Sequence, residues 1–599
     1  MAKKGNYTIN PLYQGGYSTL DPNKYSSYGD LFTGYHVPAG AIGAPTSAQT
    51  ANQIQQANNL MNQGIIPIEV GAIKPEVFDQ IPKQHFKEIN RMAKLTGSDI
   101  SVHSPIIEAS GIGEQGYDEG QRKQAEQQLM DVVERTAPMN EKGGMRITIH
   151  GAGSIPGTDY TMQEGKKKEE RLVVVNRDTG KITTALKEEE KYYPYQKEPD
   201  VLSPRSELET LNRSEWKNEI SQLSHYKENA DRIIQSHKDV LSPEMLKRVY
   251  ENPEETIHML KPDQIDAYNN LFHAEQYLRD LQMKINNMYH KAYKMAKIDN
   301  NESAIKKLDK AREKYMKMLK EGPPVVGASQ ATQSMLNTLA SKEIQPNLYQ
   351  PIEDYATEKS ANTFSNVALN SYKKYKDKAP VISIENMFPG MAFSYGKELK
   401  DLIQESKNQF VDKAVSQGVM SESKAKSQAD KLIGATLDVG HLNIAKKKGF
   451  KDKDLVKEMA EIAKHVKHVH VTDNFGYSDS HLPPGMGNVP VKEIMEKLEK
   501  EGKGDVTKVL ETAGWFQHFK TSPLPYNLEA LGANMFATGQ EPYWNQKQGL
   551  SQGYSGGFGM MLPQVNYNTF GAGFAQLPSE LGGSVQGGKG SRMSGKPMQ

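Results

Sequence analysis

Residues 468 to 488, HVHVTDNFGYSDSHLPPGMGN, gather five potential metal ligands at the end of a β-branched run. They are His468, His470, Asp473, Asp479 and His481. Imidazole and carboxylate groups are common ligands of divalent metals. The chain contains no cysteine, so thiolate sites, disulfides and cysteine nucleophiles are excluded, and any metal must be held by His, Asp or Glu. The stretch therefore indicates metal chemistry at the point where a strand ends.

The overall charge of the chain excludes a global electrostatic attraction to anionic partners. The 599 residues include 74 basic and 73 acidic side chains, for a formal net charge of +1. Binding to nucleic acid or to a membrane surface must therefore be local. The N-terminal stretch has no apolar run behind Lys3 and Lys4, and no later segment approaches the ~20 apolar residues that cross a bilayer. We expect a soluble, cytoplasmic protein with no membrane partner.

Both ends of the chain differ in composition from the middle. Residues 1–34 are rich in Gly, Tyr, Ser and Asn, and residues 540–599 are rich in Gly, Gln and Ser. Such segments lack the apolar content that offsets the entropy of ordering, so we expect flexible tails. The aromatic and Met residues of the second tail leave open an interaction segment instead.

Between the tails, short β-branched runs alternate with helix-like stretches. The strand-like runs are 65–72, 99–105, 145–153, 380–387, 433–443, 466–474 and 507–514. Most are separated by segments whose apolar residues fall at three- and four-residue spacing, which indicates amphipathic helices. This alternation predicts parallel βαβ units that close into an α/β fold, a (β/α)₈ TIM barrel. We assign its two parts to residues 35–155 and 355–539.

One interval is too long for a simple βα unit. From His150 to Glu385 there are 385 − 150 = 235 residues. We therefore predict a large, mainly helical insertion over 156–354, after the third strand. Residues 171–186 have two β-branched runs around a turn, which predicts a β-hairpin. The following stretches interleave Lys and Glu, as solvated helix faces do, and predict a helical hairpin.

The expected strand ends carry polar groups instead of apolar ones. In a TIM barrel the functional groups lie where strands end at the C-terminal face. So many titratable groups in one barrel mouth would repel one another or remain buried without partners unless cations held them. A metal cluster is the simplest interpretation. The ten groups are His103, His150, Glu385, Asp438, His441, His470, Asp473, Asp479, His481 and Glu511.

This set resembles the xylose-isomerase-like TIM-barrel superfamily, and within it the endonuclease IV family of apurinic/apyrimidinic endonucleases most of all. The resemblance covers residues 35–155 and 355–535, and its motifs are Asp438-x-x-His441, Asp479-x-His481 and the turn PPGMGN. It implies a phosphodiester hydrolase with up to three zinc ions that cleaves DNA at an abasic site. The segment His103-Ser-Pro-Ile-Ile-Glu departs from the family pattern, because it lacks the family's DNA-opening tyrosine.

The resemblance also implies a role for each position. Glu385 would position the attacking group and Glu511 would act as base, while Asp473 is left without a ligand role. The implied zinc ligands are His103, His150 and Glu385 for the first ion, Glu385, Asp438, His470 and Glu511 for the second, and His441, Asp479 and His481 for the third.

Two other functions remain open. The same superfamily contains sugar and sugar-phosphate isomerases and epimerases, which would hold one Mn²⁺ or Mg²⁺ at Glu385, Asp438, His470 and Glu511 and act on a small sugar. The remaining positions discriminate, because single-metal chemistry does not need His103, His150, Asp479 and His481. The third possibility is a non-catalytic binding scaffold. In all three cases the insertion or the tails are candidate contacts for a protein partner.

Overall fold

The computed structural model describes residues 33–531, apart from 36, 38, 238, 243, 246–247, 250–251, 322–323, 513–514 and 516–522. Residues 540–599 and all but the last two residues of 1–34 lie outside this range, so the predictions for both tails are not addressed. Within the described residues, no helix is both long enough and apolar enough to cross a bilayer.

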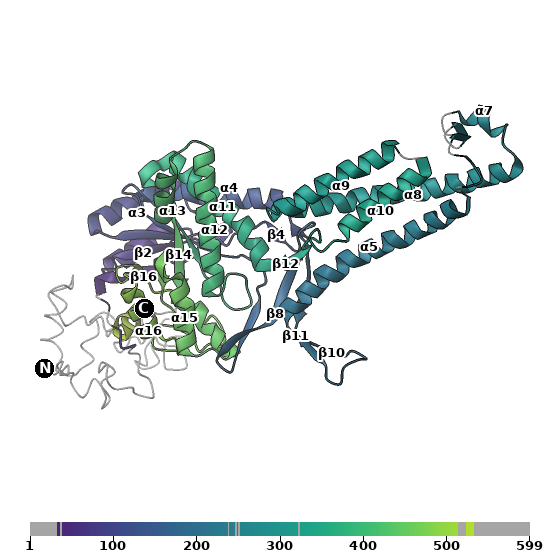
Figure 1. Ribbon diagram of the computed structural model, residues 1–599. Coiled ribbons are helices and arrows are strands. Elements are labelled where there is room, and N and C mark those ends of the chain that lie inside the picture. The colour runs from purple at the N-terminus through teal and green to yellow at the C-terminus, as the bar shows by residue number, and fades with distance from the viewer. Residues whose placement is uncertain are drawn as a thin grey trace, which may run out of the picture. The chain divides into compact units, whose positions relative to one another are not determined.

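A closed barrel of eight parallel strands forms the centre of the larger unit (Figure 1). Around the barrel the strand order is β1-β16-β15-β14-β13-β6-β3-β2, so neighbours in the chain are neighbours in space. The predicted TIM barrel is therefore confirmed. The strands are β1 (Ile42–Pro45), β2 (Pro67–Gly71), β3 (Asp99–His103), β6 (Arg146–His150), β13 (Val381–Glu385), β14 (Ile433–Asp438), β15 (Val466–His470) and β16 (Thr507–Val509).

The first strand was missed by the sequence pattern. β1 has only four residues, IGAP, and pairs with β16 on one side and β2 on the other. A Cβ at Gly43 would lie 2.9 Å from the carbonyl oxygens of Lys508 and Pro67, so the strands pack too closely here for a side chain. β1 precedes the three strands that the sequence predicted before the insertion. The predicted position of the insertion, after the third strand, was therefore wrong. It follows the fourth barrel strand, β6.

Helices cover the outside of the barrel (Figure 1). Their buried faces follow the expected spacing; in α16, for example, Val491, Ile494, Met495 and Leu498 are buried. The main covering helices are α1 (Gln53–Asn62), α2 (Pro75–Gln80), α3 (Lys83–Thr96), α4 (Glu119–Thr136), α11 (Ile352–Tyr375), α12 (Gly396–Ser416), α13 (Glu422–Leu432), α15 (Asp452–Ile462) and α16 (Val491–Lys500).

A second compact unit comprises residues 174–351, where the sequence predicted an insertion over 156–354. Its long helices run side by side, and their buried residues, Trp216 and Leu278 among them, form one apolar core (Figure 1). The first two of these helices pack against each other and form the predicted helical hairpin. The helices are α5 (Pro204–His237), α8 (Pro262–Ile298), α9 (Glu302–Glu321) and α10 (Pro324–Leu339).

The start of the long insertion is built from strands. The predicted β-hairpin is confirmed, since β8 (Lys166–Asn176) pairs with β9 (Ile182–Lys187). β8 also pairs with β7 (Asp159–Gln163), which the sequence did not predict. The turn between β7 and β8 contains Glu164 and Gly165, both at positive φ. Residues 156–173, the first part of the predicted insertion, belong to the barrel unit and not to the helical one.

Two carboxyl groups close to the β7–β8 hairpin predict a pH-dependent stability. Burial and the nearby Glu353 raise the pKa of Glu398 to about 8. A carboxyl group with a raised folded-state pKa stabilises the fold below its unfolded pKa, and this contribution is lost as pH rises toward about 8. Glu398→Gln should therefore gain a few degrees in Tm relative to wild type at pH 9 but not at pH 5. Equal Tm differences at both pH values would contradict this assignment.

Candidate metal centre

The structure brings all nine predicted ligand residues to one end of the barrel. Five are the last residues of their strands: His103, His150, Glu385, Asp438 and His470. Glu511 follows β16 by two residues, His441 lies in the short helix α14 (Val439–Asn443), and the loop after β15 carries Asp479 and His481. Parallel strands that end at the same face thus gather groups from across the chain.

The first cluster has two imidazoles around one carboxylate oxygen. Oε2 of Glu385 lies 3.2 Å from Nε2 of His103 and 3.4 Å from Nε2 of His150. The two rings stand edge to face, with centroids 5.1 Å apart. Nδ1 of His103 lies 3.1 Å from the carbonyl oxygen of Ser104, so its Nε2 is left to face the cluster.

The second cluster uses the other oxygen of the same glutamate. Nδ1 of His470 lies 2.8 Å from Oε1 of Glu385 and 3.2 Å from Oε2 of Glu511. Asp438 completes the group, whose four ligand atoms all lie within 4.8 Å of one another. All four side chains are buried. Glu385 therefore joins the first two clusters through its two oxygens.

The third cluster lies beside the second. Oδ2 of Asp479 is 3.3 Å from Nε2 of His441 and 2.9 Å from Nε2 of His481. The opposite ring nitrogens contact backbone carbonyls: Nδ1 of His441 is 2.8 Å from the oxygen of Asn386, and Nδ1 of His481 is 3.0 Å from that of Glu511. A proton on each Nδ1 leaves each Nε2 free to bind a cation.

The Asp438-x-x-His441 spacing follows from helix capping. Oδ1 of Asp438 accepts hydrogen bonds from the backbone N–H groups of Gly440 (2.7 Å) and His441 (3.0 Å) and from the hydroxyl of Thr472 (3.1 Å). An aspartate N-cap satisfies the free N–H groups of the first helical turn. The capping contacts occupy Oδ1 and leave Oδ2 toward the second and third clusters.

Burial and proximity set the protonation of the cluster. Burial lowers the pKa of His150 to about 4, so this imidazole is neutral at pH 7. Burial also raises the pKa of Asp438. Burial alone would lower the pKa of His103, but the contact with Glu385 outweighs this effect and raises the pKa to about 9. Without cations, protons on some of the imidazoles thus balance the carboxylates.

The donor set fits divalent cations. Oδ2 of Asp438 and Oδ1 of Asp479 are buried and have no hydrogen-bond donor among the described residues, and Oε2 of Glu385 has only the two imidazoles beside it. A buried carboxylate oxygen without a partner is costly, and a cation removes that cost. Neutral imidazole and carboxylate ligands without thiolates suit Zn²⁺ and Mn²⁺.

Side-chain amides hold the loops that carry the ligands. Asn386 forms two hydrogen bonds to the backbone at the end of β14. Its Nδ2 donates to the carbonyl of Asp438 (3.0 Å), and its Oδ1 accepts from the N–H of Asp438 (2.8 Å). Asn443 of α14 donates to Oδ1 of Asn474 (3.0 Å) and of Asn488 (2.7 Å) in the loop after β15. The sequence places Asn386 directly after Glu385 but gives no sign that this amide or the others position the ligand loops.

Asp473 lies in none of the three clusters, and the structure gives it another role. Its Oδ1 accepts from the backbone N–H groups of Asn474 (2.8 Å) and Val489 (3.0 Å), and its Oδ2 from that of Gly485 (2.7 Å). A Cβ at Gly487 would lie 2.3 Å from Oδ1 of Asp473. Asp473 therefore organises the PPGMGN turn and with it the loop that carries His481.

Replacement of this aspartate should loosen the loop. In Asp473→Asn, an amide NH₂ group faces N–H groups that need acceptors, so we expect a loss of about 2 kcal/mol in the free energy of unfolding. Urea unfolding monitored by circular dichroism measures this loss. Limited proteolysis should show new cleavage between 474 and 489. Wild-type stability together with an uncut loop would show that Asp473 is dispensable there.

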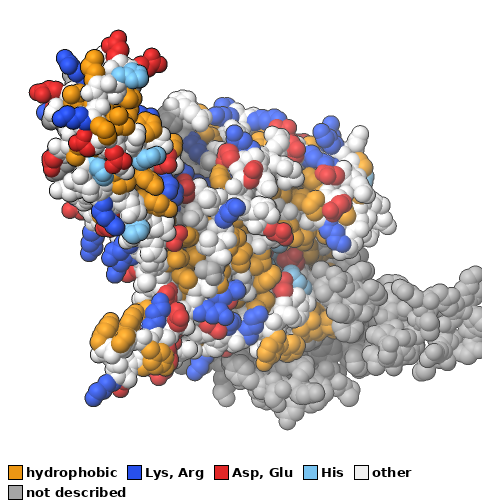
Figure 2. Space-filling view, turned by 90° about the vertical axis from the view of Figure 1, so that its right-hand side faces the viewer, with side chains coloured by type: hydrophobic (Ala, Val, Ile, Leu, Met, Phe, Trp, Pro, Cys, Tyr) orange, Lys and Arg blue, Asp and Glu red, His pale blue; other side chains and the backbone are white. Residues whose placement is uncertain are grey.

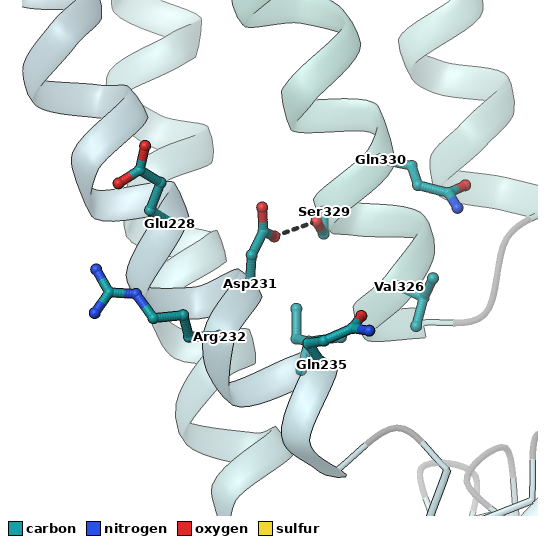
Figure 3. Close-up of a pocket in the computed structure, with 8 residues that line it drawn as sticks. Glu228, Asp231, Arg232, Gln235, Val326, Ser329 and Gln330 are labelled. Atoms are coloured by element: carbon teal, nitrogen blue, oxygen red, sulfur yellow. Dashed lines mark hydrogen bonds between the residues drawn. The ribbon is translucent and has the colours of Figure 1, made fainter.

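The helical unit contains a separate cavity of about 580 Å³ between α5 and α10 (Figure 3). Asp231 points across it and accepts a hydrogen bond of 2.6 Å from the hydroxyl of Ser329. Lys227, buried beside it, pairs with the same aspartate. Asp231 thus has partners in Ser329 and Lys227, and no metal-ligand cluster is found there among the described residues.

Comparison with known proteins finds partial similarities. The profile of the xylose isomerase-like TIM barrel matches residues 421–520. The uncharacterized protein MJ1311 of Methanocaldococcus jannaschii is 37% identical over 79 residues, which are 13% of this chain and 26% of that protein. The chain thus matches about a quarter of the length of this curated relative.

The comparison with solved structures finds proteins that are named sugar epimerases or epimerase-like. A D-tagatose 3-epimerase-like protein has 12% identity and a TM-score of 0.35, covering 82% of this chain and 97% of that one. D-psicose 3-epimerase of Clostridium cellulolyticum H10 has 9% identity and a TM-score of 0.36, covering 82% and 96%. L-ribulose 3-epimerase has 10% identity and a TM-score of 0.34, covering 84% and 99%.

The closed parallel barrel, with polar groups at one end, defines a TIM-barrel protein. Its residues 421–520, which include six of the nine clustered residues from Asp438 to Glu511, match the profile of the xylose isomerase-like TIM barrel. This superfamily contains isomerases, epimerases and endonucleases.

Proposed function

We propose that the chain is a metal-dependent phosphodiester hydrolase with a three-ion centre. The observation that carries this proposal is the set of three adjoining clusters. The ligand atoms of the second cluster, and those of the third, lie within 4.8 Å of one another, and His103 and His150 of the first contact Oε2 of Glu385. Glu385 connects the first two clusters, and Asp438 lies between the second and third. Single-metal chemistry needs only the second cluster. The first cluster's histidines and the complete third cluster, Asp479 with two imidazoles, are then unexplained.

The arrangement suits a phosphodiester, whose single negative charge increases as a nucleophile adds to phosphorus. Bound divalent cations supply Lewis acidity, neutralising the phosphate oxygens. Glu385 lies between two clusters, where its carboxylate orients the group that attacks phosphorus. Glu511 is ionised, because His470 holds its pKa at about 2 against the effect of burial, and the ionised carboxylate is the form that binds a cation. DNA with an abasic site is the first substrate to test, because the family resemblance implies it.

The second candidate is sugar or sugar-phosphate isomerisation at a single metal. The four residues of the second cluster are complete by themselves and fully buried. Glu385 and Glu511 would then act as the acid and base that move a proton beside a carbonyl. On the face shown in Figure 2, basic and acidic side chains are interspersed and form no broad basic surface of the kind that DNA-binding proteins use.

One experiment separates the two candidates. Zinc-loaded protein is incubated with duplex DNA containing a tetrahydrofuran abasic analogue, and manganese-loaded protein with D-fructose, D-tagatose and L-ribulose. The proposal expects a nick 5′ to the analogue that disappears in His481→Ala and persists in Glu398→Gln, a matched carboxyl change outside the clusters. Ketose epimerisation that survives His481→Ala, without DNA cleavage, would instead establish the second candidate.

A further inference from the structure

A buried carboxylate lies beneath the metal centre, inside the barrel. Glu69 is the third residue of β2, and only 1% of its surface is exposed. Among the residues that the structure describes, no Lys or Arg pairs with Glu69. Its partners are two histidines of β15 and two hydroxyl groups. Oε2 accepts hydrogen bonds from Nε2 of His468 (2.9 Å), Ser101 (3.2 Å) and Thr148 (3.4 Å). Burying an ionised carboxylate costs free energy unless it is paired and hydrogen-bonded, so these contacts must offset that cost.

The other oxygen of Glu69 faces a residue of the second cluster. Oε1 lies 2.9 Å from Nε2 of His470, on the side of the ring opposite to Glu385 and Glu511. The two ring nitrogens of His470 thus face different carboxylates: Nδ1 faces the centre, and Nε2 faces the barrel interior. An imidazole that binds a cation through Nδ1 carries its proton on Nε2.

We infer that Glu69 is a positioning residue for this centre. Its carboxylate takes the Nε2–H of His470 and so selects the tautomer and ring orientation that turn Nδ1 toward Glu385 and Glu511. His468, buried and bound to the second oxygen, holds the carboxylate in place. Such outer carboxylates orient a ligand and increase its basicity. The inference deepens the proposed function and rests on it, because it requires a cation at the second cluster.

The same contacts distinguish positioning from a further metal site. Glu69, His468 and His470 lie close enough together to hold an ion. Each imidazole, however, meets a different oxygen of Glu69. Nε2 of His468 is hydrogen-bonded to Oε2, and Nε2 of His470 lies 2.9 Å from Oε1 as an ion-pair contact without the angle of a regular hydrogen bond. A positioning role therefore predicts that Glu69 changes the affinity of an existing ion, whereas a metal site predicts one ion fewer.

The test compares Glu69→Gln with Glu353→Gln. Glu353 is also buried in the barrel unit, where it accepts the backbone N–H of Thr158, but it lies outside the clusters. Zinc affinity is measured by chelator competition at fixed pH, zinc content by elemental analysis, and the Tm of metal-free protein by calorimetry. We expect Glu69→Gln to weaken the affinity for one ion by about 10- to 100-fold, while excess zinc still fills every site. Glu353→Gln should have the zinc affinity and zinc content of wild type.

The outcomes separate the inference from the proposed function. A wild-type protein that binds no metal overturns the proposed function itself. If Glu69→Gln binds zinc with wild-type affinity, the inference is overturned but the proposed function is not, even if the Tm of the variant is lower. If the variant lacks one ion at saturating zinc, the inference is also overturned, and Glu69 is instead a ligand of a further metal site. If Glu69→Gln does not fold, His468→Leu decides, because it removes the anchor of the carboxylate; it should weaken one ion several-fold, and unchanged affinity overturns the inference.

Discussion

Glu385→Gln should reduce phosphodiesterase activity by at least about 10³-fold and weaken binding of two ions at once. Glu385 is the only residue whose two oxygens serve two clusters, with Oε2 between the first-cluster imidazoles and Oε1 beside His470. An amide has the same shape but presents one oxygen and no charge. The loss of zinc should therefore exceed that caused by any single change in the third cluster. Initial rates and zinc content of the purified variant measure the two effects.

The control for this variant is Glu398→Gln, which also exchanges a carboxyl for an amide in the barrel unit but lies outside the clusters. It should keep wild-type activity and zinc content at pH 7. A Glu385→Gln protein that folds, retains full zinc and cleaves at the wild-type rate would show that Glu385 does not bridge the two clusters.

Gly440→Ala should remove the third ion and lower the free energy of unfolding by about 3 kcal/mol. A Cβ at Gly440 would lie 1.9 Å from the hydroxyl oxygen of Thr472 and 3.2 Å from Oδ1 of Asp438. Both atoms are buried and take part in the cap of α14, so the helix that carries His441 must move. Because a metal site needs its ligands placed within about 0.5 Å, we expect the third cluster to lose its ion.

Gly504→Ala is the matched control, because its added Cβ would be 3.2 Å from Cγ of the flexible Glu499 side chain, away from the barrel mouth. Unfolding in urea and zinc analysis apply to both variants. If Gly440→Ala has the stability and zinc content of Gly504→Ala, the close contact with Thr472 does not constrain the site.

The sequence predicted which side chains gather at the barrel end better than it predicted the residues that position them. The candidate ligands are recognisable because His103, His150, Glu385 and Asp438 end their strands, and a TIM barrel brings such ends together whatever their separation in the chain. The roles of Glu69 and Asp473 were not predicted. Glu69 contacts β15, about 400 positions away, and Asp473 binds backbone groups that carry no side-chain signal.

The fold was predictable where the pattern was strong. Seven strands showed β-branched or apolar runs, but IGAP has one β-branched residue, a Gly and a Pro, and becomes a strand only because barrel closure places it between β2 and β16. This short strand also shifted the predicted position of the insertion. The insertion's helices followed from its periodicity, whereas β7, exposed and polar, has little sequence signature.

The measurement that tests the central claim most directly is elemental analysis of the purified, zinc-reconstituted protein beside His481→Ala. The three clusters predict about three zinc ions per chain, falling to about two in the variant. One ion per chain, unchanged in His481→Ala, would contradict the three-ion centre and leave single-metal sugar chemistry. No ion at all after reconstitution would contradict both and leave a binding scaffold.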